Sequence, residues 1–307
     1  MVTTEAPDGV AGLGLSHLHE SVRPIAELSA AERLGYVRAD RWIGYPAANE
    51  ALQRLETLLA WPAKQRMPNL LLVGPTNNGK SMIIEKFRRT HPVISHDDRE
   101  EIPVLVVQMP SEPSIGRFYA AVLATVGAPR RNYRIAEVEQ VVVGLLRATG
   151  VRMLIIDELH NVLGGRSDRR REFLNLLRFL GNELRIPLVG VGTRDAYLAI
   201  RTDDQLENRF APLTLSRWEP TGEACSLMAS FAASFPLRRP SPIATAEMTS
   251  YLLTRCEGTI GELATLLTEA ATVAITTGAE SINSHTLQQA AYAGPTERRR
   301  LFERELT

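Results

Sequence analysis

The stretch that decides the fold reads Asn69-Leu70-Leu71-Leu72-Val73-Gly74-Pro75-Thr76-Asn77-Asn78-Gly79-Lys80-Ser81. The apolar run 69–73 predicts a short buried strand. The run 74–81 matches G-x-x-x-x-G-K-[ST], the pattern of a phosphate-binding loop, and a helical pattern follows at 80–90. Glycines let the backbone wrap around an anion, so that the N–H groups of the loop and first helical turn point at phosphates.

The loop predicts ATP and Mg²⁺ as cofactors. Lys80 would reach the β- and γ-phosphates, and the Ser81 hydroxyl would bind the metal ion. The residues of this segment that we expect to line the nucleotide are Gly74, Pro75, Thr76, Asn77, Asn78, Gly79, Lys80, Ser81 and Met82.

Another apolar run, 153–156, is followed directly by Asp157 and Glu158. After a phosphate-binding loop, this pattern indicates an aspartate that holds Mg²⁺ through water and a glutamate that acts as general base on the attacking water. His160 completes a D-E-x-H sequence, which also occurs in some helicases. A helicase of that type needs a second motor domain, for which this chain has no room, so we interpret His160 as a polar residue hydrogen-bonded near the site.

Two further positions carry groups that could sense or stabilise the γ-phosphate. Thr193 follows an apolar run at 187–191 and is the sensor candidate, although a threonine there could equally cap the next helix. Arg209, followed by Phe210, suits an arginine finger. A surface arginine paired with Glu207 or Asp204 is the alternative for Arg209, and Arg194 and Arg201 are rival fingers.

The order of elements predicts an α/β fold with a parallel five-stranded sheet. Apolar runs at 69–73, 103–107, 152–156, 187–191 and, more weakly, 212–215 alternate with helical patterns, which implies a sheet covered on both faces. From about residue 221 only helical patterns occur, so a small all-helical domain follows. The expected divisions are an N-terminal arm at 1–40, the α/β domain at 41–218, the helical domain at 219–293 and a charged tail at 294–307.

Composition is that of an ordinary globular protein, with 44% hydrophobic and 23% charged residues among 307. No apolar run approaches the roughly 20 residues of a membrane-spanning helix, and the N-terminus carries no secretory pattern. We therefore expect a cytoplasmic protein without a membrane partner. The formal net charge is zero, so any contact with nucleic acid must come from local clusters.

The candidate DNA-binding residues are Arg117, Arg130, Arg131 and Arg134, which lie between the second and third apolar runs. Arg166 and the run 169–171 form a second basic cluster, which follows the acidic strand end and is expected near the same surface. Arginines in such clusters would contact phosphates without sequence preference and with strong salt dependence. The alternative is a solvated turn whose arginines pair with Asp168 and Glu172.

The motifs together resemble an AAA+ ATPase, and residues from about 38 to 300 resemble the TniB family of transposon ATPases, which is related to TnsC and IstB. The likeness is carried by Ala39-Asp40-Arg41-Trp42-Ile43-Gly44-Tyr45-Pro46, by 74–81, by Asp157-Glu158-Leu159-His160-Asn161-Val162-Leu163 and by Gly258-Thr259-Ile260-Gly261-Glu262-Leu263. One departure is that no arginine stands in the last segment, where AAA+ lids often place one, so a γ-phosphate sensor there is either absent or replaced by Arg255.

The resemblance implies a helper protein for DNA transposition. Such a protein binds ATP, assembles as a homo-oligomer (ring or filament) on double-stranded DNA, and recruits a separate transposase, with a target-selector protein as a further partner. It also implies that Ile43 and Gly44 pack on the adenine, that Arg209 acts on a neighbouring subunit, and that the helical domain is a lid. The alternatives are an initiator or helicase-loading ATPase, or an ATP-binding switch that acts through a protein partner.

Overall fold

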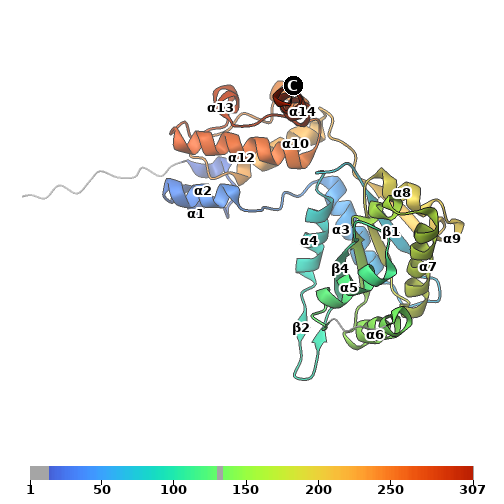
Figure 1. Ribbon diagram of the computed structural model, residues 1–307. Coiled ribbons are helices and arrows are strands. Elements are labelled where there is room, and N and C mark those ends of the chain that lie inside the picture. Colours follow the sequence, from blue (N-terminus) through green and yellow to red (C-terminus); the bar gives the residue numbers. More distant parts are fainter. Residues whose placement is uncertain (1–13, 130–133, 307) are drawn as a thin grey trace, which may run out of the picture. The chain divides into compact units, whose positions relative to one another are not determined.

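The computed structural model describes residues 14–129 and 134–306, and these fall into two compact units (Figure 1). One unit spans 44–217 and holds the sheet. The other is helical and combines the described residues up to Ile43 with those from Trp218 onward. Each unit is described by itself below.

The sheet unit contains a five-stranded parallel sheet in the order β4-β5-β6-β1-β7. Its strands are β1 (Asn69–Val73), β4 (Val104–Gln108), β5 (Met153–Asp157), β6 (Leu188–Gly192) and β7 (Phe210–Thr214). Val73 pairs with Gly192 on one side and with Thr214 on the other, so the carboxyl ends of these strands meet at one edge. The predicted α/β class and parallel five-stranded sheet are confirmed.

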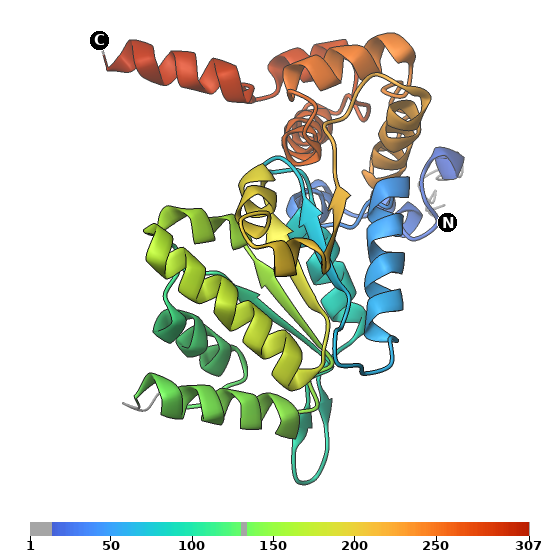
Figure 2. The ribbon, with the colours of Figure 1, turned by 90° about the vertical axis from the view of Figure 1, so that its right-hand side faces the viewer.

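Helices cover both faces of this sheet (Figure 2). α3 (Pro46–Leu59) and α4 (Lys80–Thr90) lie on one face. On the other face lie α5 (Ile115–Thr125), α6 (Ile135–Ala148) and α7 (Ser167–Leu184). Shorter elements follow the strands, namely η2 (Leu159–Gly164), α8 (Arg194–Ile200) and α9 (Asp204–Glu207). A ribbon of β2 (Ile94–Ser95) and β3 (Glu100–Glu101), which we did not expect, pairs outside the main sheet.

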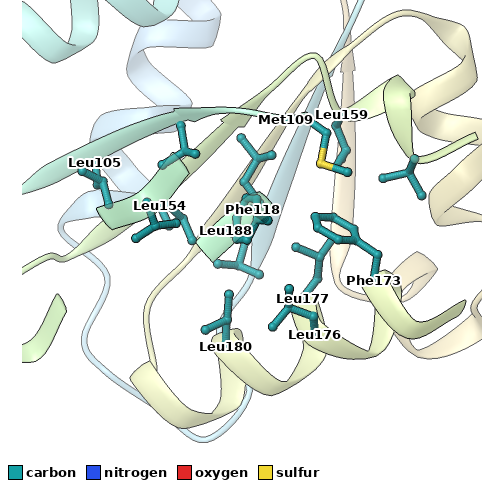
Figure 3. Packing of buried hydrophobic residues seen from close by; sticks show 14 of the residues in the cluster. Leu105, Met109, Phe118, Leu154, Leu159, Phe173, Leu176, Leu177, Leu180 and Leu188 are labelled. Atoms are coloured by element: carbon teal, nitrogen blue, oxygen red, sulfur yellow. The ribbon is translucent and has the colours of Figure 1, made fainter. Parts of the chain in front are cut away.

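The core between the sheet and α5–α7 fixes the strand ends that carry the site (Figure 3). Phe118 and Phe173 meet edge to face, with ring centroids 5.2 Å apart. Gly190 on β6 is needed for close packing, because an added Cβ would lie 2.5 Å from Cδ2 of Leu159. Leu159 is fully buried directly after the Asp157-Glu158 pair, so this contact holds the turn after β5 against β6.

The helical unit is built from two separate parts of the chain. Its C-terminal part contains α10 (Gly222–Ser234), α11 (Ala246–Arg255), α12 (Ile260–Thr276), α13 (Ser284–Gln289) and α14 (Pro295–Glu305). Its N-terminal part contains η1 (Leu15–His17), α1 (Arg23–Glu27) and α2 (Ala30–Arg38). Of the described helices, none has the length and apolar character that crossing a bilayer would require.

The segment 1–40 is predicted from the sequence to form an N-terminal arm. Its described part packs within this helical unit. The side chain of Arg33 on α2 is 3% exposed and its Nη1 lies 2.6 Å from Oε2 of Glu280. A second donor of Arg33, Nη2, lies 2.7 Å from Oε1 of the same carboxylate. Both contacts join the Arg33 guanidinium to the Glu280 carboxylate. Separating the two groups would leave a buried charge without its partner, so this ion pair holds the N-terminal segment in place.

Candidate nucleotide site

The phosphate-binding loop joins β1 to α4 and has the backbone that its glycines predict. Gly79 has φ of 83° at the start of α4, and Asn77 has φ of 58°, so two residues adopt the left-handed region. The N–H of Gly74 donates to the carbonyl of Gly192 at 3.1 Å. Gly74 leaves no room for a side chain, since an added Cβ would lie 2.8 Å from the carbonyl oxygen of Leu215.

Lys80 lies inside the curve of this loop. Its side chain is largely buried, and Nζ donates to the carbonyls of Gly74 at 2.9 Å and Pro75 at 2.6 Å. Burial lowers the pKa of Lys80, while the nearby Glu158 and Asp157 carboxylates act in the opposite direction. A cation held there is placed to meet the phosphates of a nucleotide that the loop encloses.

Asn78 connects the loop to the segment after β7. Its side-chain amide is buried and donates to the carbonyls of Leu215 at 3.1 Å and Ser216 at 2.9 Å. Because the side-chain amide is used in these bonds, the predicted contact of Asn78 with phosphate would be made by its backbone N–H. Sequence reasoning did not find this anchor, because its partners lie 137 and 138 residues away along the chain.

The predicted metal ligands meet at the ends of β1 and β5. The hydroxyl of Ser81 donates to Oδ2 of Asp157 at 2.8 Å. Hydroxyl and carboxylate oxygens suit Mg²⁺, which takes its other ligands from water and phosphate. The residues present therefore fit the ion that the loop implies. The other oxygen of Asp157, Oδ1, accepts from the backbone N–H of Glu158 at 2.8 Å, which fixes the orientation of the carboxylate.

Glu158 follows β5 in a left-handed conformation, with φ of 57° and ψ of 33°. This conformation is costly for a glutamate, and such strain tends to gather at functional sites. Its Oε2 lies 3.1 Å from Nε2 of His160, so His160 neighbours the candidate general base as the sequence interpretation expects. His160 is in turn pressed against β6, since an added Cβ at Gly192 would lie 3.2 Å from its Nδ1.

Thr193 stands at the end of β6, between the strands that carry the loop and the acidic pair. It is the residue that caps α8 by position, yet its side chain makes no capping hydrogen bond. At the start of α8 it is the backbone of Thr193 that forms a hydrogen bond, because its carbonyl accepts from the N–H of Ala196 at 2.9 Å. The hydroxyl is therefore not used as a cap, which suits the predicted sensor.

Arg209 lies at the opposite end of the parallel strands from the phosphate-binding loop, directly before β7 begins. Its carbonyl accepts from the N–H of Asn69 at the start of β1, and its Nη1 donates to Oδ1 of Asn182 at 2.8 Å. Arg209 thus forms no salt bridge with Glu207, which pairs instead with the rival finger Arg201 at 3.1 Å. The other rival, Arg194, is exposed in the first turn of α8.

The remaining predicted nucleotide contacts fall at the borders of the site. Met82 is exposed in the first turn of α4. Ile43 ends the helical unit and Gly44 begins the sheet unit, so their contact with adenine stays a prediction. Arg255, considered as a substitute γ-phosphate sensor, donates to the carbonyls of Leu287 at 3.0 Å and Tyr292 at 3.1 Å. Those bonds give Arg255 a structural role inside the helical unit.

The basic clusters are only partly within the described residues. Arg130 and Arg131 lie outside them. Arg117, in the first turn of α5, is exposed, and its guanidinium is 3.9 Å from Glu112. Arg134 is exposed just before α6.

The structure brings the loop before α5 against the loop before α7. An added Cβ at Gly165 would lie 2.2 Å from Cγ of Pro113, and one at Gly164 would lie 3.2 Å from the carbonyl oxygen of Ser111. Arg166, 87% exposed and 3.8 Å from Asp168, follows directly. Arg117, in the first turn of α5, and Arg166, directly before α7, therefore follow two neighbouring loops, in line with the expectation that the two clusters lie near the same surface.

Known structures share this fold. The Orc1 protein of Aeropyrum pernix in complex with DNA matches with a TM-score of 0.59 at 18% identity, covering 84% of this chain and 68% of that one. Cdc6p of Pyrobaculum aerophilum gives a TM-score of 0.56 at 16% identity, covering 83% and 69%. Domain III of the Thermotoga maritima replication initiation protein DnaA gives 0.51 at 12% identity, covering 81% and 93%. At these identities the likeness shows the fold alone, which is that of the AAA+ ATPases.

The family assignment comes from the sequence itself. The model of the bacterial TniB protein family matches residues 33–220, more than half of the chain. The match includes the phosphate-binding loop, the acidic end of β5, Thr193 and Arg209. The chain therefore belongs to the bacterial TniB family and has the AAA+ fold.

Proposed function

We propose that this protein binds and hydrolyses ATP as an oligomer on double-stranded DNA, and that it thereby recruits and activates a separate transposase at its target. The observation that carries the catalytic part is the meeting of three strand ends at one edge of the sheet. There the Ser81 hydroxyl lies 2.8 Å from Asp157, with Lys80 inside the loop and Glu158 beside them. Ser81 and Asp157 would hold Mg²⁺ there, and the ion would supply positive charge that offsets the negative charge that develops during hydrolysis.

Each residue of the site has a distinct part in hydrolysis. Lys80 and the loop N–H groups bind and orient the phosphates, and Ser81 with Asp157 holds the metal ion. Glu158 accepts a proton from the attacking water as its oxygen forms a bond to the γ-phosphorus and the bond to the β-phosphate oxygen breaks. Thr193 lies between these groups and contacts the γ-phosphate.

The position of Arg209 supports an active site shared between copies. Arg209 is bonded to the start of β1, whereas the phosphate-binding loop follows the end of β1. A strand of five residues spans roughly 16 Å, so Arg209 does not serve the nucleotide of its own copy. An Arg209 that contacts a γ-phosphate belongs to a second copy. Such head-to-tail contacts produce closed rings or open filaments.

The DNA and transposase parts of the proposal rest on the family, supported by the placement of the arginines. Arg117 and Arg166 are exposed and follow neighbouring loops. Their ion pairs with Glu112 and Asp168 are long, at 3.9 and 3.8 Å. Such exposed pairs are weak and leave both guanidinium groups free to exchange partners. We propose that these two arginines, with Arg130, Arg131 and Arg134, contact the phosphates of duplex DNA. A target-selector protein is a further expected partner.

Replacing both Arg117 and Arg166 with alanine is expected to weaken DNA binding without altering ATP binding. Each lost phosphate contact lowers the slope of log affinity against log salt by about 0.9, so the double variant should lose nearly 2 from this slope. Fluorescence anisotropy with labelled duplex DNA across a salt series measures it. Arg54→Ala is the matched control, because Arg54 is an exposed arginine on α3 paired only with Glu50. An unchanged slope in the double variant would place the DNA surface elsewhere.

An initiator or helicase-loading ATPase is the rival function, and the likeness to Orc1, Cdc6p and DnaA is what favours it. That likeness lies at 12–18% identity and extends to the fold only. The TniB match favours transposition instead. A pull-down with a replicative helicase and, in parallel, with a candidate transposase separates the two.

A further inference from the structure

A pocket lies beside Arg209, at the end of the sheet where the parallel strands β1 and β7 begin. Its volume is about 470 Å³, within the usual range for a site that binds a small molecule. The residues that line it come from the segment before β1 and from the segment around α9. They are Lys64, Arg66, Met67, Pro68, Gln205, Asn208 and Arg209. We call it the cationic pocket.

Three of these residues are cations and none is an acid. Within the part of the chain that the structure describes, no carboxylate lies within 4 Å of the charged groups of Lys64, Arg66 or Arg209. Lys64 Nζ lies over the ring of Trp61, 5.1 Å from its centroid, and Arg209 donates to the neutral amide of Asn182. Like charges gathered in a concave surface focus a positive potential that favours an anion.

Two of the three acids in the segment around α9 are paired with other cations, and the carboxylate of the third, Asp204, lies more than 4 Å from the charged groups of the described cations of the pocket. Asp203 Oδ2 lies 3.5 Å from Nη1 of Arg178. Glu207 Oε1 lies 3.1 Å from Nε of Arg201. The positive charge of the pocket is therefore not neutralised by its own surroundings, and the ligand that suits it is one with several negative charges.

We propose that the cationic pocket receives the phosphate groups of the nucleotide held by a second copy, with Lys64 and Arg66 acting beside Arg209. This inference rests on the shared active site proposed above and adds two cations to it. The chain carries its phosphate-binding loop at one edge of the sheet and this pocket at the other. Head-to-tail association can therefore bring the two together at every interface. The proposed DNA surface at Arg117 and Arg166 follows the opposite ends of the strands, so duplex DNA is not the ligand.

Lys64 and Arg66 are expected to bind the phosphates more tightly as charge develops during hydrolysis. Cations fixed in a water-poor interface before the reaction stabilise that charge without rearranging. Asn182 supports this by holding Arg209 in one orientation at 2.8 Å. The effect is an activation in trans, in which each copy hydrolyses ATP only when a neighbour presents its pocket.

The experiment compares ATP turnover by Lys64→Ala/Arg66→Ala, Arg209→Ala, Glu158→Gln and the control Arg54→Ala, alone and in mixtures. The double variant should lose turnover by about 10- to 100-fold, while binding a fluorescent ATP analogue as the unaltered protein does. Adding an equal amount of Glu158→Gln should restore turnover, because the intact pocket of one variant faces the intact nucleotide site of the other. Random mixing completes about one interface in four, so the mixture should reach roughly a quarter of normal turnover.

Each other outcome has a definite meaning. If Arg209→Ala loses turnover and recovers on mixing but the double variant keeps normal turnover, the inference is overturned and the shared active site stands. If only Arg209→Ala recovers on mixing, Lys64 and Arg66 act within their own copy, which also overturns it. A double variant that keeps normal turnover without DNA but has a lower salt slope for DNA would make the pocket a DNA site. If no variant recovers on mixing, the shared active site itself is wrong.

Discussion

Replacing Glu158 with glutamine is expected to reduce ATP turnover by about 10²- to 10⁴-fold, the usual contribution of a general base. The amide keeps the size and hydrogen-bonding reach of the side chain but cannot accept the proton of the attacking water. Lys80, Ser81 and Asp157 are untouched, so ATP binding should persist. The variant should therefore accumulate as the ATP-bound oligomer on DNA.

Steady-state phosphate release and sedimentation on duplex DNA measure the two parts of this prediction. The matched control is Glu183→Gln, since Glu183 is an exposed glutamate on α7 that pairs with Arg147 on the surface. Normal turnover in the Glu158→Gln protein would show that another group activates the water. Reduced turnover without accumulation on DNA would keep the catalytic assignment and separate it from assembly.

Replacing Lys80 with alanine is expected to weaken ATP binding by about 100-fold or more, because two charge-assisted contacts with the phosphates are lost. The ammonium group is largely buried in the loop, where it donates to the carbonyls of Gly74 and Pro75. Isothermal titration with a slowly hydrolysed ATP analogue measures the loss.

Lys86→Ala is the control for Lys80, since Lys86 lies on the same helix outside the loop. Circular dichroism should show that the Lys80→Ala protein keeps its helix content. A well-folded Lys80→Ala protein that binds ATP within a few-fold of the unaltered protein would contradict the placement of the nucleotide in this loop.

Most strands of the sheet could be predicted because they are short apolar runs that are largely buried. Four of the five lie within one residue of the predicted limits, and β7 begins at Phe210, two residues before the predicted 212. Phe210 is buried while Ala211 and Pro212 are exposed, so the apolar pattern at this edge strand is interrupted. The ribbon of β2 and β3 has only two residues in each strand and little burial, which leaves no pattern to detect.

Interactions between distant parts of the chain could not be predicted. The pairing of Arg33 with Glu280 joins residues 247 positions apart, and neither has a local pattern that names the other. The same holds for the anchor from Asn78 to Leu215. Spacing in sequence located the residues of the candidate nucleotide site, because loop, strand end and helix start are local features.

The cationic pocket illustrates the same limit at the site. Arg209 could be singled out because it ends a helix and precedes a strand, as an arginine finger does. Lys64 and Arg66 stand in a polar break between α3 and β1, and nothing in that stretch indicates a partner. Only the parallel pairing of β1 with β7 brings the two segments to the same edge of the sheet.

The measurement that tests the central claim most directly is ATP turnover by the unaltered protein with and without duplex DNA, across a salt series. We expect DNA to raise turnover, because phosphate contacts gather copies and so bring each nucleotide against the pocket of a neighbour. We expect this gain to disappear as salt rises, since salt weakens the phosphate contacts. Turnover that is the same with and without DNA at every salt concentration would contradict a DNA-assembled ATPase.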